Sequence, residues 1–295
     1  MLRRNKVKRS AGEWVFDTCN TVFLACIAFT ALYPFVFIFL YSISDPTRMM
    51  GRIGIILWPR GFQAEAYRMV FMNPMITTGY LNTLFYLFFG LLINMVMTMT
   101  AAYALSRRGV KFKRIISLFI IFTMFFSGGL IPFYLQVRAY GLLDSRLALL
   151  LPSAMSAFNL IIMRTGFETV PISLEESAKL DGATHLQICF RIIVPLSLPV
   201  IAVITLYYGV YHWNAWYHAM IFIRTRDLYP LQLILREILI ANQTDNMMVE
   251  SGIVAALGEA IKYATIIVAT LPVLCVYPFL QRYFVKGIMI GAVKE

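Results

Sequence analysis

The distribution of hydrophobic and charged positions divides the chain into six long uncharged runs, separated by shorter charged segments. The runs that lack Asp, Glu, Lys and Arg are residues 18–44, 69–106, 115–137, 147–163, 192–223 and 263–281. A bilayer core of roughly 30 Å requires about 20 helical residues. Because each run reaches or nearly reaches that length, the pattern predicts six membrane-spanning helices. The shortest run, 147–163, is bracketed by Arg146 and Arg164, whose long side chains can extend to the membrane surface.

The composition of the 295 residues supports this prediction. Hydrophobic residues make up 60% of the chain and charged residues 14%, and the mean hydropathy is +0.73, which is outside the usual range of soluble domains. A formal charge of +11 is also compatible with nucleic-acid binding, but the Lys and Arg residues lie in the connecting segments. We therefore expect a lipid bilayer, and no nucleic acid, as the partner of these charges.

The basic residues predict that both termini lie in the cytoplasm. In that orientation the inner segments carry most of the Lys and Arg residues, as the positive-inside rule requires. The first run lacks a convincing cleavage site, so we expect it to be retained as a span. The expected divisions are 1–76 (cytoplasmic lead-in, first span and outer loop), 77–281 (membrane core) and 282–295 (cytoplasmic tail). The strongest basic cluster comprises Arg107, Arg108, Lys111, Lys113 and Arg114.

Residues 171–199 form the one polar, amphipathic interruption between two predicted spans. Ser173 and Glu176 have the S-x-x-E spacing of a capping box, which predicts that a short cytoplasmic helix starts near Ser173. Gly182 permits a bend between two helical pieces. On these helix signals alone, an ordinary connector between spans is an equally good interpretation. The residues expected to face water or a partner are Glu175, Lys179 and Asp181.

The spacing from Glu176 onward favours an element that docks a partner over an ordinary connector between spans. It closely resembles the EAA motif, E-A-A-x3-G-x9-I-x-L-P, of permease subunits in binding-protein-dependent ABC importers. Ser177 replaces one alanine of the motif and Val194 replaces its leucine. The extended form, with Asp181 and the PLSLP ending, is similar to the carbohydrate-uptake branch that includes maltose-type permeases. The matching positions are Glu176, Ser177, Ala178, Gly182, Ile192, Val194 and Pro195.

The resemblance extends over nearly the whole chain. Further matching segments are NTLFY at 82–86, AAYALSR at 101–107, SGGLIPFYL at 127–135, YGLLDS at 140–145, HWNAW at 212–216 and the C-terminal VKGIMIGAVKE. The SGGLIP and GIMIGAVK segments are similar to a subgroup assigned to complex oligosaccharides or polysaccharide-derived substrates.

The resemblance implies an all-α type I ABC importer permease (MetI-like) fold with six transmembrane helices and both termini cytoplasmic. It also implies a heterodimer with a second homologous permease, two ATP-binding cassette ATPase subunits and an extracytoplasmic solute-binding protein. ATP and Mg would bind those ATPases, because this chain contains no G-x-x-x-x-G-K-[ST] motif, and we expect no catalytic residue or cofactor in it. The implied mechanism is alternating access. The expected ATPase-coupling residues are Ser173, Glu175, Glu176, Ser177, Ala178, Asp181, Gly182 and Ala183.

Polar and aromatic residues within the spans are candidates for a substrate pathway. Segment 207–217 is rich in Tyr and Trp, whose rings offer faces for sugars. Interhelical hydrogen bonds and an interfacial aromatic belt explain the same residue types. The predicted pathway residues are Asn94, Trp213, Asn214 and Tyr217.

Other candidate chemistry is sparse. His212 and His218, six residues apart, would lie on different faces of one helix, which argues against a shared metal. An ion-coupled secondary transporter is the alternative, but the apolar runs offer no formally charged coupling group. A membrane hydrolase would need a nucleophile and base that no motif provides. The cysteines, which lack C-x-x-C spacing and are expected to be packing residues, are Cys19, Cys26, Cys189 and Cys275.

Overall fold

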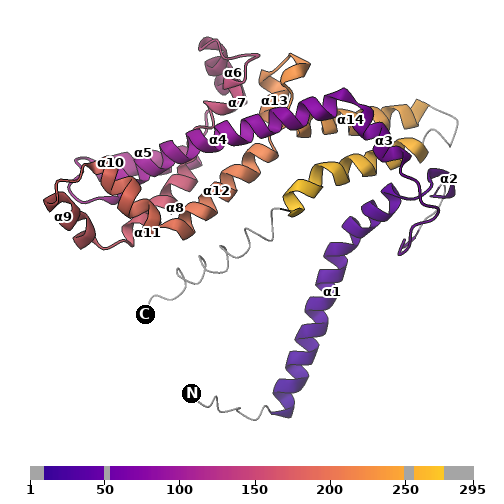
Figure 1. The fold of residues 1–295 in the computed structure, drawn as a ribbon, viewed down its shortest axis with the longest axis horizontal. Helices are drawn as coiled ribbons and strands as arrows, with labels where there is room; N and C mark the ends of the chain where they lie inside the picture. The colour runs from indigo at the N-terminus through magenta and orange to yellow at the C-terminus, as the bar shows by residue number, and fades with distance from the viewer. Residues whose placement is uncertain (1–9, 50–53, 249–255, 276–295) are drawn as a thin grey trace. The chain divides into compact units, whose positions relative to one another are not determined.

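The computed structural model describes residues 10–49, 54–248 and 256–275, and over these ranges the fold is all-helical (Figure 1). In this described part, the one extended pairing is an isolated antiparallel bridge between Ser44 and Phe62. The chain divides into two compact units, Met1–Val70 with Ala241–Val268, and Phe71–Ile240 with Ala269–Glu295. The predicted cytoplasmic tail, 282–295, lies outside the described residues.

The first unit is built on the long apolar helix α1 (Ala11–Ser42). The short helices α2 (Pro46–Met49) and α3 (Glu65–Met72) follow it in the chain. Tyr41 at the end of α1 donates a hydrogen bond to Glu259 Oε2 (2.8 Å), and its ring centroid lies 4.7 Å from that of Tyr263. These contacts pack α1 against the first part of the helix Ala256–Cys275.

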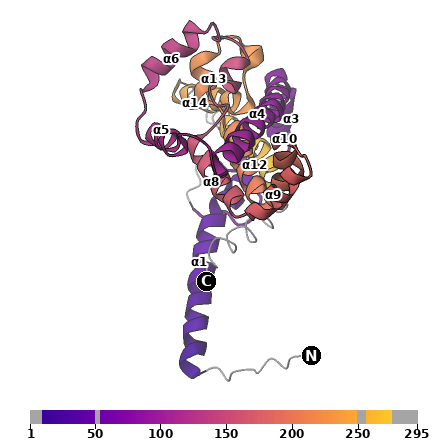
Figure 2. The ribbon, with the colours of Figure 1, turned by 90° about the vertical axis from the view of Figure 1, so that its left-hand side faces the viewer.

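The second unit has a core of three mutually packed helices, α4 (Pro74–Ser106), α8 (Ala157–Glu168) and α12 (Leu198–Trp213). α4 begins where Asn73 Oδ1 accepts from Met75 N (3.0 Å) and Pro74 occupies the first helical position, a favourable pairing at a helix start. The core cluster includes Leu160 and Ile204, both almost fully buried. α5 (Lys113–Phe125) packs against α8 (Figure 2).

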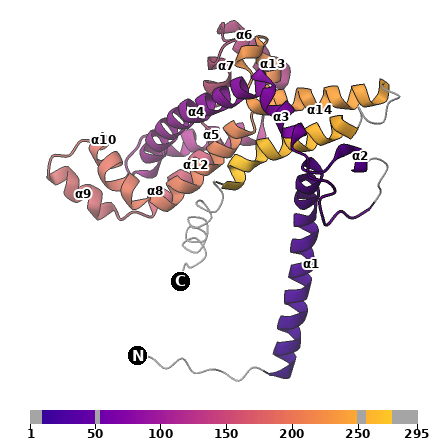
Figure 3. The same cartoon turned by 45° about the vertical axis from the view of Figure 1, so that its right-hand side comes forward.

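Short elements gather at the two ends of α4. At its C-terminal end lie α9 (Ile172–Leu180), α10 (His185–Ile188), the π-helix η1 (Cys189–Ile193) and α11 (Val194–Leu196) (Figures 1 and 3). Nearer its N-terminal end lie α7 (Leu147–Leu150), α13 (Tyr217–Phe222), the 3-10 helix η2 (Arg226–Leu228) and the start of α14 (Leu231–Met248). α6 (Leu130–Ala139) follows α5 in the chain.

Three described helices are long and apolar enough to cross a membrane: Ala11–Ser42, Pro74–Ser106 and Ala256–Cys275. They fall on the predicted runs 18–44, 69–106 and 263–281. Two further candidates are bent pairs, Lys113–Phe125 with Leu130–Ala139 (116°) and His185–Leu196 with Leu198–Trp213 (91°). If each bent pair is one span, the described residues contain five candidates, against the six that the sequence predicts.

The difference arises where helix-breaking residues interrupt the apolar runs. The run 147–163 is not one helix, because α7 ends at Leu150 and α8 begins only after Ser156. Pro152 lies in this gap, and proline both lacks the amide donor and obstructs the preceding turn of a helix. In the run 115–137, α5 ends before Gly129, whose φ of +83° is a conformation that glycine adopts readily.

Candidate functional site

The polar segment 171–199 folds into two short helices, α9 and α10, which we call the α9–α10 hairpin (residues 172–188). α9 begins directly after Pro171, whose φ of −56° and ψ of 134° place it at the N-cap, and no side chain caps the helix. The predicted capping box at Ser173 and Glu176 is therefore wrong. Proline fixes φ and needs no amide partner, so the helix starts before Ser173.

A capping box does exist in the hairpin, eleven residues beyond the predicted one. Thr184 N donates to Gln187 Oε1 (2.8 Å), and Gln187 N donates to Thr184 Oγ1 (3.4 Å). This T-x-x-Q pair opens α10 and has the spacing expected of such boxes. The T-x-x-Q pattern at 184–187 is readable in the sequence, but the capping box was predicted from the S-x-x-E pattern at Ser173 and Glu176.

Gly182 forms the bend between the two helices, as the sequence predicts. Its φ is +80°, its N–H bonds to Lys179 O (3.0 Å), and Ala183 N bonds to Ala178 O (2.9 Å). These two hydrogen bonds form a Schellman motif, which requires a left-handed residue after the helix. A side chain at Gly182 would meet nothing within 4 Å, so this turn presents an open surface.

Glu175 departs from the prediction that it faces water or a partner. Its side chain and that of Arg107 are each 6% exposed, and Arg107 Nη1 lies 3.1 Å from Glu175 Oε2. Lys179 Nζ lies 2.8 Å from the other oxygen, Oε1. Burial favours a higher pKa for Glu175, but the hydrogen bonds from Lys179 and Arg107 outweigh it, so the pKa of this carboxyl lies below its ordinary value. The group is therefore a buried carboxylate.

The other predicted coupling residues divide between the buried side and the exposed side of the hairpin. Ala178 is buried and Ala183 is half-buried, while the exposed members are Ser173, Glu176, Ser177, Asp181 and Gly182. Sequence reasoning missed Leu180, which is 90% exposed at the end of α9. The turn that follows it borders a pocket of about 460 Å³, lined by Ala178, Asp181, Gly182, Ala183, Gln187, Arg191 and Ile192.

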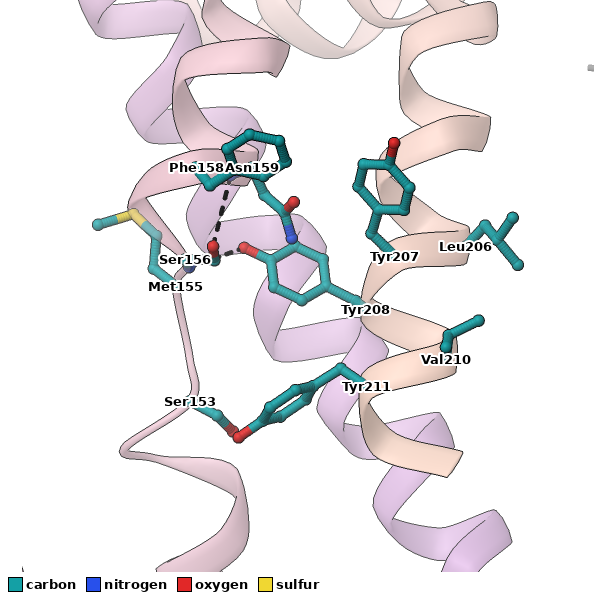
Figure 4. A pocket seen from close by; sticks show the side chains of 10 residues that line it. All are labelled: Ser153, Met155, Ser156, Phe158, Asn159, Leu206, Tyr207, Tyr208, Val210 and Tyr211. Atoms are coloured by element: carbon teal, nitrogen blue, oxygen red, sulfur yellow. Dashed lines mark hydrogen bonds between the residues drawn. The ribbon is translucent and has the colours of Figure 1, made fainter. Parts of the chain in front are cut away.

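A larger cavity of about 620 Å³ lies between α8 and α12 (Figure 4), and we call it the tyrosine cavity. In Figure 4, Tyr208 reaches toward Ser156, and the Tyr211 hydroxyl points toward Ser153. Ser156 N donates to the Tyr208 hydroxyl (2.9 Å), which is also hydrogen-bonded to Thr98 Oγ1 on α4 (2.8 Å). The lining residues are Ser153, Met155, Ser156, Phe158, Asn159, Leu206, Tyr207, Tyr208, Val210 and Tyr211.

None of the four predicted pathway residues lines this cavity. Asn94 is fully buried, where its amide donates to Ser153 O (2.5 Å) and His212 Nε2 donates to its Oδ1 (2.6 Å). This is the interhelical hydrogen bonding that the sequence left open as an alternative. Trp213 is buried near Tyr80, the Asn214 amide donates to Val210 O of its own helix, and Tyr217 is exposed beside Trp216. The cavity instead uses Tyr207, Tyr208 and Tyr211 of the same aromatic segment.

The sequence predicts His212 and His218 on one helix, but the structure places them on two. α12 ends at Trp213, and His218 lies on α13, where its Nδ1 is hydrogen-bonded to the Tyr211 hydroxyl (3.3 Å). No group of three or more His, Cys, Asp or Glu side chains suited to a metal occurs among the described residues. All four cysteines are free, and Cys189 is buried in the core while the other three are exposed.

Known proteins resemble this chain in both sequence and fold. The profile of the family described as "Binding-protein-dependent transport system inner membrane component" matches residues 95–290. The chain is 40% identical to Protein LplC of Bacillus subtilis over 283 residues, covering 95% of each chain. It is also 40% identical to the polygalacturonan/rhamnogalacturonan transport system permease protein YtcP of Bacillus subtilis, covering 95% of this chain and 98% of the relative.

A solved structure shares the fold. It is the crystal structure of a bacterial ABC transporter involved in the import of the acidic polysaccharide alginate, with a TM-score of 0.84 and 34% identity. The match covers 95% of this chain and 100% of that chain. The resemblance that the sequence shows to importer permeases is thus confirmed, and the protein is a multi-pass protein of the bacterial plasma membrane. The chain belongs to the family of binding-protein-dependent transport system inner membrane components.

Proposed function

We propose that the chain is the permease subunit of an ATP-driven importer that moves an oligosaccharide across the plasma membrane by alternating access. The observation that carries this proposal is the α9–α10 hairpin. It holds the EAA-type positions Glu176 and Gly182 on an exposed surface. A buried carboxylate, Glu175, fastens the same hairpin to α4. Such an element can receive a partner's movement on one side and pass it to membrane helices on the other.

The partner that we propose for the exposed side is the ATPase subunit. Glu176 supplies a negative charge, and Leu180, which is 90% exposed, supplies an apolar side chain on the same hairpin. Gly182 keeps the turn free of a side chain, and the pocket of about 460 Å³ beside it can accept one from the partner. In this arrangement Glu176 meets a basic group of the ATPase and Leu180 enters an apolar site.

The complete transporter would contain a second, homologous permease, two ATPase subunits and an extracytoplasmic solute-binding protein. Family membership supports this set, because a binding-protein-dependent permease acts with such components. We propose that both termini face the cytoplasm, which places the α9–α10 hairpin on the ATPase side. ATP and Mg bind the ATPase subunits in this proposal.

A carbohydrate cargo is supported by the relatives and by the tyrosine cavity. The names of YtcP and of the solved relative refer to polygalacturonan, rhamnogalacturonan and alginate. The cavity offers the rings of Tyr207 and Tyr211 together with serine hydroxyls and the Asn159 amide. Aromatic faces combined with a few polar groups are typical of sites that bind sugars. We propose that this cavity forms part of the cargo pathway.

Family membership and the cavity both argue against the alternative raised by the sequence, an ion-coupled secondary transporter. Such transporters place ionisable groups near the middle of the membrane, whereas the ten residues that line the tyrosine cavity carry no formal charge. Uptake that follows a proton gradient, and not ATP, would support this alternative.

The test is reconstitution of the tagged chain with the subunits that co-purify from its native membrane. Wild-type proteoliposomes are expected to take up oligosaccharide only with internal ATP, and the chain alone is expected to hydrolyse no ATP. Glu176→Lys and Gly182→Pro should each reduce uptake at least tenfold, because they alter the proposed ATPase contact and its turn. The control Glu65→Lys reverses a half-exposed charge outside the hairpin, whose ion pair with Arg68 spans 3.9 Å, and should change little. Undiminished uptake by both hairpin variants would contradict the proposal.

A further inference from the structure

A compact polar cluster joins the C-terminal end of α4 to two other elements. Arg107 is its centre, with Nη1 donating to Glu175 Oε2 on α9 (3.1 Å), Nη2 to Phe167 O on α8 (2.5 Å) and Nε to Ser106 Oγ (2.9 Å). The three donor atoms thus contact α9, α8 and α4 itself. The planar guanidinium is suited to holding several acceptors in a fixed arrangement.

A second contact from the same end of α4 reaches the other helix of the hairpin. The Tyr103 hydroxyl is hydrogen-bonded to His185 Nδ1 on α10 (3.2 Å), and the guanidinium of Arg107 lies 5.6 Å from the Tyr103 ring centroid. Both helices of the α9–α10 hairpin are therefore tied to the last turn of α4. The neighbouring Arg108 is exposed, so the two adjacent arginines have different surroundings.

The elements that Arg107 joins also form the surroundings of the tyrosine cavity. α8 begins at Ala157, and its first turn supplies Phe158 and Asn159 to the cavity lining. α4 carries Thr98, which is hydrogen-bonded to Tyr208 of the lining, about 13 Å from Arg107 at the helical rise per residue. Helices are rigid secondary elements that can carry a displacement along their axis. Movement at Arg107 therefore reaches Thr98 along α4, and it reaches Phe158 and Asn159 along α8.

We propose that Arg107 is the positioning residue through which movement of the α9–α10 hairpin is passed to α4 and α8, and so to both sides of the tyrosine cavity. This inference rests on the proposed function. It assigns a role to a residue outside the hairpin, which lies 68 positions from Glu175 in the sequence. Without the guanidinium, the hairpin would still present Glu176 and Leu180 to the ATPase, but its movement would no longer be shared with the helices.

The experiment compares Arg107→Met with the matched control Arg108→Met in the reconstituted complex. Three quantities are measured: the amount of ATPase subunit that co-purifies, the rate of ATP hydrolysis, and the oligosaccharide taken up per ATP hydrolysed. Arg107→Met is expected to retain the ATPase subunit and its hydrolysis, while uptake per ATP falls about tenfold. Arg107→Lys keeps the charge but not the three-way geometry and should lie between wild type and Arg107→Met. Arg108→Met should match wild type in all three.

A double variant separates positioning from stability. Replacing a buried ion pair on both sides by apolar residues often restores stability, so Arg107→Met with Glu175→Met should recover the thermal midpoint. Uptake per ATP should stay low, because the directional contacts to α8 and α9 are still absent. Recovery of uptake per ATP together with the midpoint would overturn the proposal, as would wild-type uptake per ATP in Arg107→Met.

Two outcomes need a separate arm. If Arg107→Met does not accumulate, Glu175→Gln is tested in its place, because it removes the same charge contact with little change of shape. The same fall in uptake per ATP is expected. A value of uptake per ATP equal to that of the wild type overturns the proposal. A wild-type complex that contains no ATPase subunit would instead refute the proposed function, before any variant is compared.

Discussion

At the scale of single residues, Gly90 allows α4 and α12 to approach closely where a histidine lies between them. A Cβ atom at Gly90 would overlap the His212 imidazole. That ring donates to Asn94 Oδ1, and the Asn94 amide donates to Ser153 O. His212 and Asn94 are buried and Ser153 is half-buried, and the three groups satisfy one another, which is the condition under which polar groups stabilise a membrane bundle.

Gly90→Ala is therefore expected to destabilise the protein. The added methyl must displace His212 or separate the two helices, and overpacking of this kind typically costs about 1–3 kcal/mol. The matched control is Gly209→Ala in α12, where a Cβ would meet nothing within 4 Å and alanine favours the helix by about 0.5–1 kcal/mol. The thermal midpoint in detergent should fall by several degrees for Gly90→Ala only. Equal midpoints for the two variants would contradict the close packing described.

At the scale of elements, Asp144 fastens the loop before α7 to the segment after α13. Its Oδ1 accepts from Arg224 N and Thr225 N (2.8 Å each), and its Oδ2 accepts from Thr225 Oγ1 (2.8 Å). The residue has a φ of +56°, a left-handed conformation that Asp and Asn adopt more readily than other non-glycine residues. The backbone hydrogen bonds from Thr225 and Arg224 hold the pKa of the Asp144 carboxyl below its ordinary value.

This arrangement predicts how the loop responds to substitution and to pH. Asp144→Ala loses both acceptor oxygens and all three hydrogen bonds, so the amides of Arg224 and Thr225 should exchange with solvent at least tenfold faster in hydrogen-exchange measurements. Asp144→Asn keeps the Oδ1 acceptor and should retain most of the protection. Since the folded pKa is lowered, the contact is fully present above the ordinary pKa and is lost as pH falls through the lowered one.

The pH arm has its own control in the asparagine variant. After correction for intrinsic exchange, protection of these amides in the wild type should be constant from about pH 8 to 5 and decrease below the ordinary aspartate pKa of about 3.9. Asp144→Asn should show no such decrease, because its side chain does not titrate. Loss of protection in both proteins at the same pH would show that another group is responsible.

The element scale also shows which features the sequence predicts and which it does not. Long uncharged runs predict α1 and α4 well, because a span needs only length and hydrophobicity. The bend between α5 and α6 depends on Gly129, whose left-handed conformation has no signature in hydropathy. The contact between Arg107 and Glu175 could not be predicted, because it joins residues from different helices and local periodicity carries no such information.

At the scale of the whole molecule, the proposed function makes the chain one subunit of a larger transporter. A second subunit could then cover the exposed side of the tyrosine cavity. Tyr207 and Tyr211 are exposed in the single chain although they lie within a predicted span. The aromatic segment that contains them was predicted from sequence, but the residues chosen within it, Trp213, Asn214 and Tyr217, lie outside the cavity lining. α12 ends at Trp213, and Tyr217 belongs to the next helix, α13. Helix ends are the least predictable part of a membrane segment.

The tyrosine cavity yields a prediction for transport by the assembled complex. The Tyr207 ring lies 6.3 Å from that of Phe158, with 30° between their planes, so the two aromatic side chains adjoin one another in the lining. Tyr207→Ala should reduce ATP-dependent uptake about fivefold, since an aromatic contact contributes about 1 kcal/mol. Tyr207→Phe keeps the ring and should lose less than half of that effect.

The control for this prediction is Leu198→Ala, which shortens an exposed apolar side chain of α12 outside the cavity lining. Uptake is measured over a range of oligosaccharide concentrations, with the ATPase subunit quantified in each preparation so that assembly defects are recognised. If the cargo passes the cavity, Tyr207→Ala raises the concentration needed for half-maximal uptake or lowers the maximal rate, and Leu198→Ala does neither. Uptake by Tyr207→Ala that matches Leu198→Ala would contradict a role of the aromatic face of α12 in passage of the cargo.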